Sequence, residues 1–105
     1  MSNQYMYLFV RTDISLADQA CQIAHAAAGA AARFKHPDDC NLVLIQVPDL
    51  QALFAATWIA VQQGIKGYVN YEPDDNMGFT AYCTEPIHGS KRKVFSNYKL
   101  WRGAA

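Results

Sequence analysis

The stretch YMYLFVRTDISLADQACQIAHAAAGAAARF, residues 5–34, decides the fold of this chain. It opens with a short apolar segment, Tyr5 to Val10, whose composition predicts a β-strand. The segment ends in Arg11-Thr12-Asp13, and a helix is expected to begin shortly afterwards, at Ser15. A strand that passes directly into a helix is typical of α/β proteins, in which ligands gather at the carboxyl ends of the strands.

The expected helix, from about Leu16 to Lys35, is rich in alanine, so its polar residues stand out. Four residues recur at spacings that place them on one helical face: Asp18, Gln22, His25 and Gly29. The opposite face predicts a core stripe made of Ile23, Ala27, Ala30, Ala31 and Phe34. We therefore expect a helix that packs on a sheet and presents a polar seam beside the strand ends.

Each polar residue of this seam also has an ordinary structural explanation. Gln22 and His25 could belong to the solvated face of a surface helix, and Asp18 has the spacing of a capping box with Ser15. The surrounding alanines favour a site, because they allow a ligand or another backbone to approach closely. A face that is merely solvated is usually richer in Lys and Glu.

The rest of the chain alternates between strand and helix patterns. Strands are expected at Asn41–Val47, Tyr68–Tyr71 and Phe79–Thr84. The near-continuous apolar run of the first of these is typical of a strand buried on both faces. A second helix is expected between an N-cap at Asp49 and a C-cap at Gly64. Its expected buried face consists of Leu53, Phe54, Trp58, Val61 and Ile65.

This alternation predicts βαβ units and a mainly parallel sheet. The connection between the last two strands is too short for a crossover, so these strands should be antiparallel neighbours. We therefore expect one domain, residues 1–105, with a three-layer α/β/α architecture and a mixed four-stranded sheet whose last strand is antiparallel. The final segment, Val94 to Trp101, is expected to dock on this body as a short helix or an edge strand.

Composition narrows the class of protein. The chain has 105 residues and no net charge, and no apolar run is long enough to span a bilayer. Residues 1–4 lack the features of a signal peptide, so a cytoplasmic protein is expected. Three scattered cysteines, Cys21, Cys40 and Cys83, are interpreted as reduced and mostly buried thiols. Their spacing is not that of a zinc site, and neither a metal nor a cofactor is expected.

Charge is distributed unevenly, because no acidic residue follows Glu85 and five basic residues do. This basic tail could contact the phosphates of a nucleic acid, or an acidic surface of a second copy of the chain. A homodimer is expected, because Trp58, Tyr98 and Trp101 also exceed what one small core needs.

Two motifs resemble class II peptidyl-tRNA hydrolases. In VRTDIS and QIAHAA, the family pattern is matched by Arg11, Asp13, Gln22, His25 and Ala26. The segment YEPDDNMGFTAYCTEP resembles a bacterial and phage branch of that superfamily, with matches at Glu72, Pro73, Asp74, Thr80, Ala81 and Pro86. The helix lysine that the family uses in its site is replaced by Asp18, or by Gln19 if the helix start moves by one residue.

The resemblance implies hydrolysis of the ester between a peptide and tRNA. It implies catalytic roles for Asp13, Gln22, His25, Glu72, Asp74 and Thr80. The candidate residues for binding RNA phosphates are Arg11, Lys91, Arg92 and Lys93. Carboxylates clustered near a histidine can hold a water and accept its proton, which is what such an ester requires. Two alternatives remain open: a solvated acidic turn at 72–75, and a non-catalytic module on the same fold that binds RNA, a nucleotide or a protein.

Overall fold

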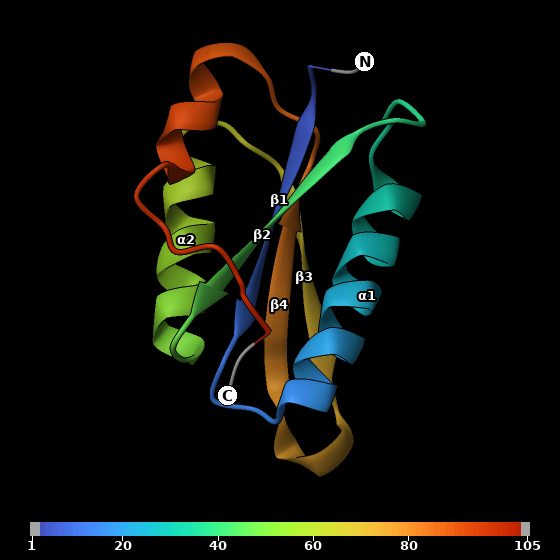
Figure 1. Ribbon diagram of the computed structural model, residues 1–105, viewed down its shortest axis with the longest axis vertical. Coiled ribbons are helices and arrows are strands. Elements are labelled where there is room, and N and C mark those ends of the chain that lie inside the picture. Colours follow the sequence, from blue (N-terminus) through green and yellow to red (C-terminus); the bar gives the residue numbers. More distant parts are fainter. Residues whose placement is uncertain (1–2, 104–105) are drawn as a thin grey trace.

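A four-stranded sheet lies between two helices in the computed structural model (Figure 1), which describes residues 3–103. Residues 1–2, which were considered above for a signal peptide, lie outside this range. The elements in chain order are β1 (Tyr5–Arg11), α1 (Leu16–Arg33), β2 (Asn41–Val47), α2 (Leu50–Gln62), β3 (Gly67–Glu72), η1 (Asp74–Asn76), β4 (Gly78–Thr84) and η2 (Gly89–Phe95). The helices α1 and α2 cover opposite faces, so the predicted three-layer α/β fold is confirmed.

The strand order is β2-β1-β4-β3, in which only β1 and β2 are parallel. The prediction of a mainly parallel sheet was wrong, because β4 inserts between β1 and β3 and runs antiparallel to both. The strands β1, β2 and β3 nevertheless point the same way. Their last residues, Arg11, Val47 and Glu72, therefore share one edge of the sheet, here called the carboxyl edge, at the lower end of Figure 1.

The strand β2 lies at one side of the sheet, and the prediction that both of its faces are buried was wrong, because the face that carries Leu42 is partly open to solvent. Leu42 is 51% exposed. The final segment of the chain covers part of the free edge of β2: Gln46 N–H donates to the Lys99 carbonyl (3.0 Å), and Trp101 N–H donates to the Leu44 carbonyl (2.8 Å). The C-terminal segment thus combines the two predicted forms, the short helix η2 followed by an edge contact.

The helix α1 begins at the predicted cap. Ser15 Oγ accepts a hydrogen bond from Asp18 N–H (3.1 Å) and donates one to the Asp18 carboxylate (2.8 Å). Its buried residues are Gln19, Gln22, Ala26 and Ala30. Ile23, Ala27 and Phe34 lie half-buried at the margin of the core, whereas Ala31 is exposed, contrary to the prediction. The alanines let α1 lie close to the sheet, which brings the neighbouring glutamines into the interior.

The helix α2 begins at Asp49, whose carboxylate accepts from Ala52 N–H (2.9 Å). It approaches the sheet through a narrow face of Leu53, Ala56 and Ala60. Three residues of the predicted buried face are instead exposed, namely Phe54 (41%), Trp58 (62%) and Val61 (61%). The cause is the rotation of the helix: its small residues allow the closest approach to the sheet, Phe54 and Val61 lie on its flank, and Trp58 lies on its outer side.

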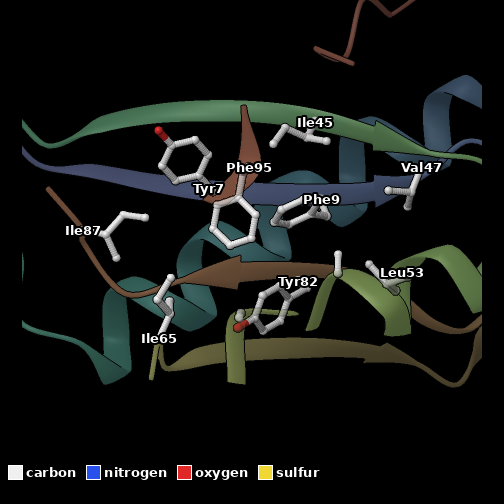
Figure 2. Close-up of a cluster of buried hydrophobic side chains, with 11 residues drawn as sticks. Tyr7, Phe9, Ile45, Val47, Leu53, Ile65, Tyr82, Ile87 and Phe95 are labelled. Atoms are coloured by element: carbon white, nitrogen blue, oxygen red, sulfur yellow. The ribbon is translucent and has the colours of Figure 1, made fainter. Parts of the chain in front are cut away.

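The core between α2 and the sheet combines four aromatic rings with aliphatic side chains (Figure 2). Phe9 of β1 lies between Phe95 of η2 and Tyr82 of β4, with ring centroids 5.1 Å and 6.0 Å away. Ile65, which follows α2, is buried beside them as predicted. This packing fixes η2, and the basic residues it carries, at the end of the molecule where β1 begins.

Candidate functional site

Four polar side chains from α1, β3 and β4 form a hydrogen-bonded group, here called the Gln22 cluster: Gln22, Asn70, Glu72 and Thr80. The amide oxygen of Gln22 accepts from Asn70 Nδ2 (2.7 Å) and from Thr80 Oγ1 (2.7 Å). Its amide nitrogen donates to Glu72 Oε1 (3.1 Å). Gln22 is 1% exposed, so the interpretation of this residue as part of a solvated face was wrong. The cluster holds one carboxylate, that of Glu72, in a defined orientation.

A β-bulge in β4 directs Thr80 into this cluster. Asn70 pairs with Ala81 and Tyr71 pairs with Phe79, so Thr80 is the extra residue on β4. In a regular strand, alternation would place Thr80 on the α2 face, the face that Tyr82 occupies. The bulge turns Thr80 to the α1 face instead, where its hydroxyl reaches Gln22.

Glu72 is the last residue of β3 and is half-buried at the carboxyl edge. Its second oxygen accepts a long hydrogen bond from Asp74 N–H (3.5 Å). Within residues 3–103 the one ion pair joins Arg11 and Asp13, so no described cation neutralises Glu72. A carboxylate that is fixed by an amide, and not by a cation, keeps lone pairs available for a water or a substrate hydroxyl.

Arg11 ties the end of β1 to the start of β4. Its guanidinium donates two hydrogen bonds to the Asp13 carboxylate (2.9 and 2.8 Å) and one each to the carbonyls of Met77 and Phe79 (3.0 and 2.9 Å). The hydrogen bonds from Arg11 hold the pKa of Asp13 below its ordinary value, which outweighs partial burial. Asp13 and Arg11 thus shape the carboxyl edge around the acidic loop.

The remaining predicted residues lie at the surface. Asp74 is exposed in the turn after β3, at the same edge as Glu72. His25 is exposed on α1, about one helical turn beyond Gln22, and its ring makes no hydrogen bond to a described residue. The structure therefore joins Gln22, Glu72 and Thr80 directly and leaves His25 free in solvent.

Asp18, at the position of the family lysine, is satisfied by Ser15. The basic candidates of the C-terminal segment, Lys91, Arg92 and Lys93, lie far from Asp18. Arg92 stacks on the ring of Tyr5, the first residue of β1 (3.5 Å to the centroid), and donates to Tyr7 Oη (3.2 Å). Since β1 has seven residues, the segment with Lys91 and Lys93 lies about 20 Å from Arg11 along the strand.

The prediction omitted Asn70, whose amide completes the Gln22 cluster. A polar residue in the centre of the apolar segment GYVNYE was the available signal, because a buried amide needs partners. The cysteines are free, and Cys21 is exposed, contrary to the expectation of mostly buried thiols. Burial raises the pKa of the Cys83 thiol to about 12, which keeps it protonated at neutral pH.

Comparison with protein-family models and with curated proteins gave no match. Among residues 3–103 no helix is long and apolar enough to cross a membrane.

Proposed function

We propose that this chain hydrolyses an ester at its carboxyl edge, and that the ester joins a peptide to tRNA. The observation that carries the proposal is the Glu72 carboxylate, which is half-buried, has no cation partner among the described residues, and is oriented by the buried amide of Gln22. The resemblance of the Arg11–Ala26 and Glu72–Pro86 segments to class II peptidyl-tRNA hydrolases supports the choice of substrate.

In the proposed reaction Glu72 acts as a general base. It accepts a proton from a water as the water oxygen attacks the ester carbonyl. The bond between the carbonyl carbon and the ribose oxygen then breaks, and His25 gives that oxygen a proton. His25 is exposed, so it regains a proton from solvent, and Glu72 releases to solvent the proton that it took from the water. Gln22 is a positioning residue, and Thr80 and Asn70 hold its amide.

Contacts with the tRNA are proposed at two separate places. The ester end would occupy the carboxyl edge, and the basic segment Lys91–Lys93 would contact phosphates at the other end of β1. The separation of about 20 Å corresponds to roughly six base-pair steps of a duplex, so one tRNA can reach both places. Arg11 contributes by shaping the edge, since its guanidinium already donates four hydrogen bonds.

One observation favours the second candidate, a binding module without catalysis. Within residues 3–103 no cation forms an ion pair with Glu72, and the resemblance places Asp18 at the lysine position. A carboxylate at position 18 disfavours both a phosphate and a developing oxyanion. Weak or narrow hydrolysis is therefore the expected outcome for the isolated chain.

The test is release of peptide from a peptidyl-tRNA by the purified chain and by Glu72→Gln. Loss of a general base should lower turnover by about 10²-fold or more. Asp39→Asn is the matched control, because it removes an exposed acid from the loop that precedes β2, at the other end of the sheet. Equal turnover by wild type and Glu72→Gln contradicts the proposed base.

The same assay separates the two candidates. Asp18→Lys should raise turnover or tRNA affinity, and His25→Ala should lower turnover with little effect on affinity. Salt-dependent tRNA binding without turnover in any variant identifies the binding module. Absence of both indicates a different partner.

A further inference from the structure

An apolar surface extends from the flank of α2 to the end of β3. It is here called the α2–β3 surface and consists of Phe54, Trp58, Val61, Tyr71 and Phe79, all exposed. The ring of Phe79 lies 5.6 Å from that of Phe54 and 4.9 Å from that of Tyr71, so the patch is continuous between helix and sheet. At about 200 Å² per aromatic side chain, the exposed fractions of the four aromatic residues correspond to roughly 400 Å². A patch of this size on a small chain is typical of an interaction site.

The strand β3 borders this surface, and among the described residues 3–103 it pairs with β4 alone, so its other edge is free there. Glu85 N–H donates to the Lys66 carbonyl. In an antiparallel pair, every second residue bonds to the neighbouring strand. Because Lys66 bonds to Glu85, directly after β4, the backbone N–H and C=O groups of Gly67, Val69 and Tyr71 point away from β4. The bulge lies on β4, which leaves β3 regular along its length. Neither Pro nor Lys interrupts GYVNYE, although such residues commonly protect an edge strand.

The charges around β3 are self-complementary. Lys66 precedes the strand, whereas Glu72 ends it and Asp74 follows. None of these three side chains forms an ion pair within residues 3–103. If two β3 strands pair antiparallel about a two-fold axis at Val69, Lys66 of each copy lies opposite Glu72 of the other. Moving the axis by one residue places Lys66 opposite Asp74 instead. Both arrangements pair opposite charges.

We propose that two copies of this chain associate through antiparallel pairing of their β3 edges and thereby cover the α2–β3 surface. Paired strands form one eight-stranded sheet with both α2 helices on the same face. The flanks that carry Phe54 and Val61 then face each other across the axis, with Trp58 at their outer margin. The apolar patch together with the strand edge approaches the roughly 800 Å² per partner that a specific interface buries. The isologous charge pattern selects a second copy over an unrelated partner.

The pairing also brings a cation to the candidate site. Lys66 of the second copy would lie near Glu72 and Asp74 at the carboxyl edge, and neither of these acids has an ion pair within residues 3–103. This consequence rests on the proposed esterase function, whereas the pairing does not. An ammonium there would compensate for the acidic residue at position 18 by attracting the tRNA end.

Sedimentation velocity at micromolar concentration tests the pairing, with a dimer of the 11.7 kDa chain as the expected species. Lys66→Glu should shift the protein to monomer, because like charges would then face each other. Lys35→Glu, the same change at an exposed lysine after α1, should leave the dimer intact. Lys66→Glu combined with Asp74→Lys should restore association in part. A wild-type monomer at 100-fold higher concentration overturns the proposal, and so does equal dissociation by the two Lys→Glu variants.

A cysteine at position 69 tests the register. In a Cys21→Ser background, Val69→Cys should form a disulfide between copies on mild oxidation, because opposed residues at this position lie about 5.5 Å apart. Leu42→Cys, on the edge strand at the other side of the sheet, is the matched control. It should run as a single chain on a denaturing gel without reducing agent, because no disulfide between copies is expected there. Equal cross-linking of both variants contradicts β3 pairing. Association without turnover removes only the esterase proposal, and turnover by a strict monomer removes only the pairing.

Discussion

Gln22 is the residue on which the candidate site depends. Its amide oxygen accepts two hydrogen bonds, from Asn70 and Thr80, and its amide nitrogen orients Glu72. A buried amide of this kind is costly unless it is satisfied, and here all three partners come from the sheet. The buried side chains of Asn70 and Thr80 thus hold Gln22 in place, and Gln22 holds the half-buried Glu72 carboxylate in one orientation.

Replacing Gln22 with Leu should lower the free energy of unfolding by about 2–4 kcal/mol, because Asn70 and Thr80 lose a buried acceptor. Urea unfolding measures this loss. His25→Ala, at an exposed position without described hydrogen bonds, should change stability by about 0.5 kcal/mol or less. A loss of similar size in both variants would show that the Gln22 cluster contributes no special stability.

Asp13 should make stability depend on pH in the acid range. Arg11 lowers the pKa of Asp13 in the folded chain. The unfolded state therefore binds the proton more tightly, and the stabilisation is present above pH of about 4 and is lost as the pH falls through the folded pKa. Since Asp13 is partly solvated, about 1 kcal/mol or less is expected. Unfolding of wild type and Asp13→Asn should differ at pH 6 and converge near pH 2.

At the scale of the element, small residues decide how closely each helix lies on the sheet. Gly29 of α1 faces Tyr68 of β3, and a Cβ at position 29 would overlap the tyrosine ring. The ring is held in place, because Arg33 stacks on it at 4.1 Å and its hydroxyl donates to Asn70. This contact fixes α1 beside β3 and thereby places Gln22 over Asn70.

Gly29→Ala should therefore destabilise the chain by about 1–3 kcal/mol through overpacking, although alanine is the better helix former. In a Tyr68→Ala background the sign should reverse, with a gain of about 0.5–1 kcal/mol from helix propensity. Thermal or urea unfolding of the four proteins measures both effects. The same sign in both backgrounds would contradict the steric explanation.

For the whole molecule, one end carries the Gln22 cluster and the acidic loop, and the other end carries the basic segment of η2. Of the three aromatic residues that suggested a dimer, Tyr98 and Trp101 contribute to the monomer core. Trp101 Nε1–H donates to Gln19 Oε1 (2.9 Å), and Trp58 alone of the three is largely exposed.

The proposed pairing of two copies predicts that stability depends on protein concentration, because only the folded chain can associate. The melting temperature should rise between about 1 and 100 µM for wild type and stay constant for Trp58→Ser. In a Trp101→Phe variant, the fluorescence of Trp58 should shift to longer wavelength on dilution as the α2–β3 surface becomes exposed. A melting temperature that is independent of concentration in wild type would contradict association.

Local features were predictable from the sequence because they depend on neighbours along the chain. The caps at Ser15 and Asp49 and the bounds of β2 agree with the structure, since capping and strand formation depend on a few adjacent residues. The positive φ of Gly64 after α2 agrees as well. Periodicity located each helix but not its rotation, because alanine and larger apolar residues both satisfy an apolar stripe.

The tertiary structure alone decided what these elements contact. Insertion of β4 between β1 and β3 depends on long-range pairing. The bulge that turns Thr80 toward Gln22 has no local signal. Close packing against the sheet selected Ala56 and Ala60 for the interior and left Trp58 exposed. The sequence by itself therefore determined the elements and most of the candidate residues, whereas packing between distant segments decided which of them form one site and which surface remains open.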